Sequence, residues 1–279
     1  MRPTVRYTAM VALACAASAA GQTVTVTLNS PQNGQTVNPG DTINWSILFS
    51  VSTAGNAGLA LLSVDLTQDA SNPERFDIPP ADSVPSGMTN FARPAGICNP
   101  QDVPPASPHP AYVGLQRGAA GRKNLVQIGG AQNTFGQATA PGSGVAENAN
   151  VVAGVGHSGP TLLASGSFTA PSTPGTYTYR LATGIANVMT TANSPPLISP
   201  AVSATVDLTG GVISFNVLPC EACDANCDGV ANGLDIQAFV MRVVGFPHTP
   251  CSTCAGDMDN SGGVTVADVP AFVNCLLTE

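Results

Sequence analysis

Residues 23–28 read TVTVTL and residues 41–52 read DTINWSILFSVS, so apolar and polar side chains alternate with a period of two. This alternation is typical of a β-strand that buries one face. The same alternating pattern recurs at residues 58–68, 161–170, 175–184, 203–208 and 212–218. No segment with helical periodicity separates these strands. The sequence therefore predicts a mainly β fold, with an antiparallel β-sandwich over residues 21–218.

The composition agrees with short strands joined by turns. The 279 residues include 29 Gly and 24 Pro, and only 9% are charged, which disfavours long helices. The length allows one large domain and one smaller one. The net charge is −8, with a single lysine and no arginine cluster, so the basic surface of a nucleic-acid-binding protein is absent.

The first 20 residues have the features of a signal peptide. Arg2 and Arg6 provide the positive start, residues 9–17 are a short apolar run, and residues 17–19 (ASA) fit the cleavage rule. No later apolar stretch approaches the ~20 residues that a spanning helix needs. We therefore expect a secreted, extracytoplasmic protein without a membrane span. Lipidation at Cys15 is a weaker alternative, because Ala12 fits that signal poorly.

Between about residues 72 and 159 the alternation gives way to Pro, Gly, Ala and Asn. We expect a long excursion from the sandwich here, and it is a candidate region for ligand contact. The pieces at 124–130 and 147–156 are candidates for extra strands. The stretch TPGTYTYRL at 173–181 resembles the penultimate strand of bacterial immunoglobulin-like and cohesin-like sandwiches, a resemblance of fold that implies no function. Residues 124–136 resemble segments of exported bacterial proteins with similar tails.

The C-terminal tail differs from the rest of the chain in its charge. From residue 219 onward there are eight acids and one arginine, which gives −7 of the total −8. Calcium loops of the EF-hand kind need oxygen ligands at positions 1, 3, 5, 7, 9 and 12, and Gly at position 6 allows the sharp turn. Gly229 holds position 6 of such a loop. The predicted ligands are Asp224, Asn226, Asp228, the backbone carbonyl of Val230, Asn232 and Asp235.

The loop pattern recurs 33 residues later. The second set of predicted ligands is Asp257, Asp259, Ser261, the carbonyl of Gly263, Thr265 and Asp268. Each loop leads into an apolar helical face, within 236–244 and within 269–276. An Asx-rich turn that caps a helix would explain one loop alone, but two loops in register favour calcium binding. Ser261 replaces a carboxylate, so the second site is expected to be weaker.

This loop–helix repeat resembles the type I dockerin module over residues 219–279. The resemblance implies two bound Ca²⁺ ions and a cohesin-like protein domain as the partner. Family members usually carry Ser or Thr pairs at positions 10 and 11, where the cohesin is recognised. Here these positions hold Gly233-Leu234 and Val266-Ala267.

Six cysteines lie in the tail, at positions 220, 223, 227, 251, 254 and 275. The two Cys-x-x-Cys pairs allow a four-thiolate zinc site. In an exported chain we instead expect disulfides, whose connectivity can take 15 forms. Cys98 stands apart in the predicted sandwich and is expected to be a buried or free thiol.

The favoured hypothesis is a non-catalytic exported protein whose tail binds calcium and attaches it to another protein. The alternative is a component of polysaccharide degradation, with the sandwich as a carbohydrate-binding or hydrolytic module. Trp45 is expected in the core, and Asp65 and Asp69 do not form an evident catalytic pair. The glycines of GVGHSG at 154–159 have dinucleotide spacing, but no βαβ unit accompanies them.

Overall fold

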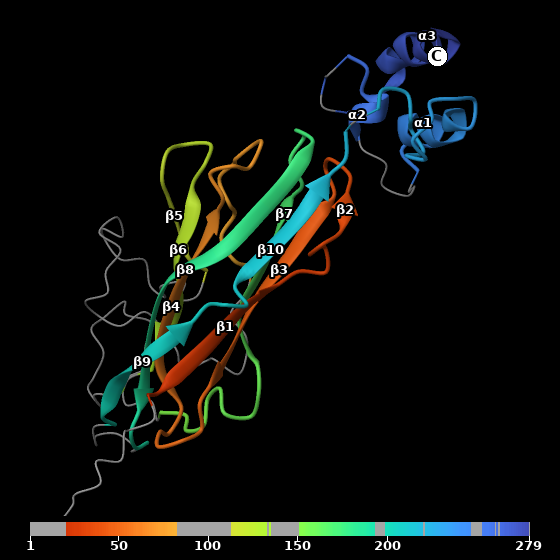
Figure 1. Cartoon of the computed structure of the whole chain (residues 1–279). Coiled ribbons are helices and arrows are strands. Elements are labelled where there is room, and N and C mark those ends of the chain that lie inside the picture. Colours follow the sequence, from red (N-terminus) through yellow and green to blue (C-terminus); the bar gives the residue numbers. More distant parts are fainter. Residues whose placement is uncertain are drawn as a thin grey trace, which may run out of the picture.

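The computed structural model describes residues 21–82, 113–132, 134, 151–192, 199–219, 221–246, 253–259, 261 and 263–278. Within them the chain is mainly β, followed by a small helical module (Figure 1). The strands are β1 (Thr23–Asn29), β2 (Thr36–Val37), β3 (Thr42–Val51), β4 (Leu59–Gln68), β5 (Leu115–Arg117), β6 (Asn124–Ala131), β7 (Thr161–Thr169), β8 (Gly175–Met189), β9 (Ala201–Asp207) and β10 (Val212–Val217). The helices are α1 (Asp235–Val243), α2 (Thr253–Gly256), the 3₁₀ turn η2 (Val266–Asp268) and α3 (Val269–Thr278).

The strands form a sandwich whose two layers are joined through β9. One layer contains β1, β3 and β7, and the other contains β5, β6, β4, β8, β10 and β2. β9 pairs antiparallel with the end of β8 and parallel with β1, so hydrogen bonding continues from one layer to the other. The predicted antiparallel sandwich is confirmed, with two parallel pairs, β1–β9 and β2–β10, as exceptions.

The predicted alternation decides which face of each strand is buried. In β1, Val24, Val26 and Leu28 are buried while the residues between them are partly exposed. β3 repeats the pattern, and Trp45 is 2% exposed, as expected for a core residue. Each large apolar side chain buried in this way contributes about 1.5–3 kcal/mol. The two inner faces thus supply one continuous core.

Aromatic rings fill one region of this core. Tyr177 and Tyr179 of β8 stack on Phe215 of β10, with ring centroids 5.8 and 5.9 Å apart. Phe168 of β7 lies 4.7 Å from Tyr179 and comes from the opposite layer. The Phe168–Tyr179 contact therefore joins the two layers, with a stabilisation beyond that of buried area alone.

The structure departs from the sequence prediction mainly in the excursion. β6 confirms the candidate strand at 124–130. The candidate at 147–156 is wrong for residues 151–156, which form no strand and include a turn at 153–156, and residues 147–150 lie outside the described residues. β2 and β5 span only two and three residues, too few to show an alternation. The predicted signal peptide and Cys98 also lie outside the described residues.

Among the described residues, no helix has the length and apolar character needed to cross a membrane.

Several aspartates of the sandwich should make its stability fall in acid. The backbone N–H of Ser71 lowers the pKa of Asp69, that of Lys123 lowers the pKa of Asp77, and the hydroxyl of Thr209 lowers the pKa of Asp207. A pKa that is lower in the folded state stabilises the fold above the ordinary value of about 4, and this contribution is lost as pH falls further.

We therefore expect a lower midpoint of urea unfolding at about pH 3 than at about pH 7. Asp77→Asn should reduce the difference between the two midpoints, because the amide no longer titrates. Equal midpoints at both pH values would contradict this expectation.

Candidate functional site

The first predicted loop folds its backbone around its own first and last aspartates. The backbone N–H of Asp228 donates to Oδ1 of Asp224 at 3.1 Å, and that of Asn226 donates to Oδ1 of Asp235 at 2.9 Å. The N–H of Asn232 donates to Oδ2 of Asp235 at 2.8 Å. Asp235 is fully buried and Asp224 is 5% exposed. Both carboxylates therefore lie inside the loop, held by backbone donors.

The second loop repeats these hydrogen bonds position by position. The N–H of Ser261 donates to Oδ1 of Asp257 at 2.9 Å, and that of Asp259 donates to Oδ1 of Asp268 at 3.0 Å. The N–H of Thr265 donates to Oδ2 of Asp268 at 2.8 Å. Asp268 is fully buried, like Asp235 in the first loop. The sequence repeat is therefore also a repeat of backbone geometry.

The two position-7 carbonyls also belong to this arrangement. The carbonyl of Val230 accepts from Nδ2 of Asn232 at 3.0 Å, and the carbonyl of Gly263 accepts from Oγ of Ser261 at 3.3 Å. Gly229, at position 6, has φ +87°, a conformation that other residues rarely adopt. Hydrogen bonds thus link the predicted ligands within each loop, and among the described residues it is the second loop that places three carboxylates close enough to share one ion.

The donor set fits a divalent cation. In the second loop, one carboxylate oxygen from each of Asp257, Asp259 and Asp268 lies within 4.8 Å of the others. Hydrogen bonds from the backbone N–H groups of Thr265 and Asp259 lower the pKa of Asp268, although burial opposes the shift. A hard cation with oxygen ligands is the kind of ion that three carboxylate groups so close together would hold.

The helices after the loops pack on each other through one aromatic pair. Phe239 of α1 and Phe272 of α3 stack with their centroids 3.8 Å apart, and both are at most 3% exposed. With Cys223 and Ala225 they make up the buried cluster of the module. η2 begins with a capping box, in which Oγ1 of Thr265 accepts from the N–H of Ala267 and Asp268 bonds back to the backbone of Thr265. So small a core depends on further constraints.

Disulfides supply such a constraint and rule out the zinc alternative. Cys223 is joined to Cys275, and Cys227 is also disulfide-bonded. Because Cys223 is used in this way, the two Cys-x-x-Cys pairs do not form a four-thiolate site. The sequence showed that disulfides were to be expected, but the pairing of residues 52 positions apart required the fold.

The outer sides of α1 and α3 form one apolar hollow of about 240 Å³. It runs between the two helices, and all of its lining residues are apolar, as the helical faces predicted from the sequence required. They are Ile236, Phe239, Val240, Val243, Val269, Phe272, Val273, Leu276 and Leu277. Leu234 and Val266, at the start of each helical segment, are 71% and 75% exposed. This surface, the α1–α3 face, carries apolar side chains that the described part of the chain does not bury.

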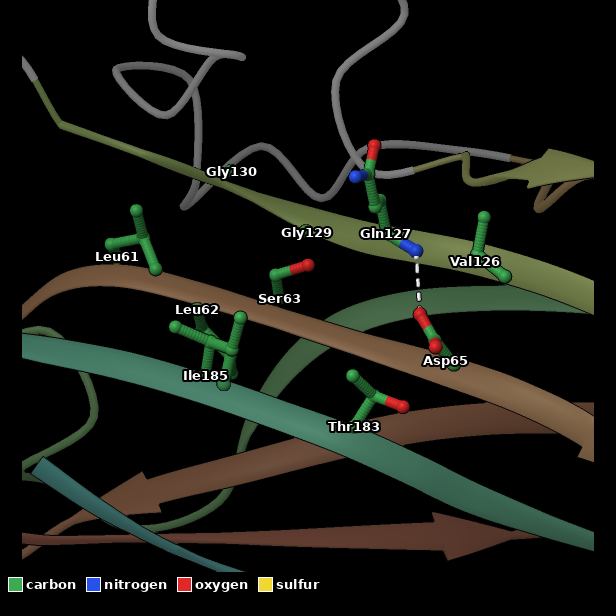
Figure 2. Close-up of a pocket in the computed structure, with 10 residues that line it drawn as sticks. All are labelled: Leu61, Leu62, Ser63, Asp65, Val126, Gln127, Gly129, Gly130, Thr183 and Ile185. Atoms are coloured by element: carbon green, nitrogen blue, oxygen red, sulfur yellow. Dashed lines mark hydrogen bonds between the residues drawn. The ribbon is translucent and has the colours of Figure 1, made fainter. Parts of the chain in front are cut away.

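A second hollow lies on the outward face of the sandwich, over β4, β6 and β8, with a volume of about 250 Å³ (Figure 2). Asp65 is one of its lining residues, and its Oδ1 accepts from the backbone N–H of Gln127 at 2.8 Å. Gln127 and Thr183 have φ of 58° and 51°, beside irregularities in the pairing of β4 with its neighbours. Sequence reasoning missed this hollow, because bulges in different strands leave no common pattern.

The hollow lacks the groups that the alternative function would need. No aromatic side chain is among the described residues that line it. Asp69, the other acid considered, forms an ion pair with Arg180 and accepts from Ser71, so it is held in a structural contact. The pair of free carboxylates typical of glycoside hydrolysis is therefore not formed by these two residues. His157, in the turn at 154–159, contacts Oδ1 of Asn56 at 2.7 Å.

No protein-family model matches the chain, and no curated protein matches it. Among solved structures, the seventh ScaB type I cohesin from Pseudobacteroides cellulosolvens aligns with 73% of this chain and 96% of its own length, at 12% identity and a TM-score of 0.36. A complex of a CaDoc0917 variant with CaCohA2 aligns with 71% of this chain and 99% of the matched chain, at 13% identity and a TM-score of 0.31. Similarities this low carry no argument about function, which rests on the chain's own residues.

Proposed function

We propose that the chain is a non-catalytic exported protein whose module at 219–279 binds two calcium ions and attaches it to a protein partner. The observation that carries this proposal is the equivalence of the two loops. Each buries its position-12 aspartate and holds it through the backbone N–H groups of positions 3 and 9. An Asx turn whose only role is to cap a helix does not need both of these hydrogen bonds to a buried aspartate, and here both loops form them.

The first ion would be held by Asp224, Asn226, Asp228, Asn232 and Asp235 with the carbonyl of Val230. The second would be held by Asp257, Asp259, Ser261, Thr265 and Asp268 with the carbonyl of Gly263. Calcium supplies positive charge that offsets the clustered carboxylates and joins both ends of each loop. The first loop offers three carboxylates and two amides, whereas the second offers three carboxylates and two hydroxyls. The first site should therefore bind calcium more tightly.

The attachment role is supported by the α1–α3 face. Hollows lined only by apolar side chains are unusual on a small module and are typical of binding surfaces. The module around this face is strongly acidic, with Arg242 as its one basic residue other than histidine. A matching partner would offer an apolar centre with basic residues at its rim. The resemblance to dockerins makes a cohesin-like domain the expected partner.

Calcium should order the module. In a calorimetric titration of the calcium-free full chain, we expect two binding events and a gain of helical circular dichroism signal. Magnesium at the same concentration is the control, because it is smaller and prefers a rigid octahedral set of ligands with several waters. A chain that shows no heat and no spectral change with millimolar calcium would refute the proposed metal function.

Leu234→Asp should separate attachment from calcium binding. Leu234 is 71% exposed, and its side chain is not among the predicted ligands, so the variant should keep the calcium affinities of the parent. A charge at this point of the α1–α3 face should weaken capture of a calcium-dependent partner by about tenfold or more. The measurement is capture by the immobilised full chain from an extract of the source organism, with calcium or with chelator.

Thr278→Asp is the matched control, because it adds the same charge at an exposed polar position of α3 and not at an exposed apolar one. Equal capture by Leu234→Asp and the parent chain would show that the partner does not use this face.

A further inference from the structure

In the first half of the module, Cys223 and Cys227 form disulfides. Each of them is next to a proposed calcium ligand in the sequence. Cys223 directly precedes Asp224, and Cys227 lies between Asn226 and Asp228. The second loop, residues 257–268, contains no cysteine. The two loops are thus alike in their hydrogen bonds but unlike in their covalent constraints.

The backbone of these two cysteines has an unusual conformation. Cys223 has φ +67° and Cys227 has φ +59°, the left-handed region that residues with a side chain seldom occupy. These turns direct the chain so that the N–H of Ala225 bonds to the carbonyl of Cys223 at 2.9 Å and the N–H of Cys227 bonds to the carbonyl of Asp224 at 3.3 Å. The first loop therefore depends on a backbone shape that local preference alone does not favour.

The Cys223–Cys275 bond ties the start of the first loop to α3. Its Cα atoms are 6.2 Å apart, across 52 residues of chain. Cys223 is fully buried, and its N–H donates to the carbonyl of Ala255 at 3.0 Å. A cross-link over such a length removes many conformations of the unfolded or open chain. It should therefore keep Asp224 near the rest of its ligand set before calcium arrives.

We propose that the disulfides of Cys223 and Cys227 are positioning groups for the first calcium loop, so that calcium affinity in this loop depends on oxidation of the cysteines. The second loop should lose less affinity when they are reduced, because its capping box and its aspartate hydrogen bonds involve no cysteine and its link to the disulfide is through Cys275 on the helix that follows it. This inference rests on the proposed calcium function. It adds that the chain acquires its full calcium capacity only after its disulfides have formed.

The test compares oxidised and reduced full chains in which one loop at a time has been disabled. Asp268→Asn leaves the first loop as the reporter, and Asp235→Asn leaves the second. Reduction with a phosphine adds two electrons and two protons to each disulfide, and the phosphine becomes its oxide with an oxygen from water. Iodoacetamide then caps the thiols, and calcium binding is measured by calorimetry.

Reduction should weaken calcium binding about tenfold or more in Asp268→Asn and by less than about threefold in Asp235→Asn. Saturating calcium should restore the helical circular dichroism of the reduced Asp268→Asn chain, which distinguishes lost positioning from irreversible unfolding. Cys223→Ser combined with Cys275→Ser, in the Asp268→Asn background, should show the same weakening without any reductant.

Equal changes in both reporters, or no change in either, would overturn this inference while leaving the calcium function in place. Failure of the reduced Asp268→Asn chain to regain helicity at saturating calcium would also overturn it, since the cysteines would then act only on folding. If the oxidised reporters themselves bind no calcium, the proposed function fails and the inference fails with it.

Discussion

Phe272→Ala should unfold the helical module while the sandwich stays folded. Phe272 is 1% exposed and stacks on Phe239 at 3.8 Å, in a buried cluster of only four residues. Truncation of a buried phenylalanine costs about 3–5 kcal/mol, and a cluster this small has little other buried surface to offset the loss. We expect a loss of helical circular dichroism at a calcium concentration that orders the module of the parent chain, and a weaker apparent calcium affinity because binding must then drive folding.

Leu277→Ala is the control for this variant, because Leu277 lies on the same helix and is 80% exposed. It should leave both helicity and calcium affinity close to those of the parent chain. Unchanged helicity in Phe272→Ala would show that the aromatic pair is not what holds the two loop–helix units together.

Gly129→Ala should disrupt the pairing of β4 with β6 in the sandwich. Gly129 has φ +139°, and a methyl group at this position would overlap the carbonyl oxygen of Leu62. Leu62 and Gly129 belong to paired strands, so neither backbone can move without breaking ladder hydrogen bonds. The destabilisation should reach about 1–3 kcal/mol or more, measured as the shift of the unfolding midpoint of the sandwich in urea.

Gly121→Ala distinguishes the steric clash of a methyl group from the cost of placing alanine at a positive φ. Gly121 also has a positive φ, +77°, but a methyl group there would meet no atom within 4 Å. Its midpoint should shift less than that of Gly129→Ala. If both variants shift equally, the backbone conformation and not the close approach of the strands is the dominant constraint.

The sandwich and the helical module are stabilised in different ways. The sandwich holds its shape through a large apolar core, so its variants report on stability. The module has a small core, disulfides and two acidic loops, and our two proposals couple its shape to calcium and to oxidation. A face that becomes ordered only when the loops are loaded would make attachment depend on calcium.

The site was more fully predictable from the sequence than the sandwich topology. The proposed loop ligands follow one another within twelve residues, and their geometry depends on local turns, so spacing alone indicated these candidates. The strands β1, β3, β4, β7 and β10 were also predictable, because alternation records which side chains are buried. Strand order was not, since β1 pairs with β9 across most of the chain.

The sequence by itself determined the strand alternation, the duplicated acidic loops and the apolar faces of the two helices, because each depends on residues close together in the chain. Only the tertiary structure decided that β9 joins the two layers, that Cys223 pairs with Cys275, and that two separate helical faces meet in one hollow. These features join residues far apart in the chain. They depend on how whole elements pack to bury the most apolar surface, which no local pattern records.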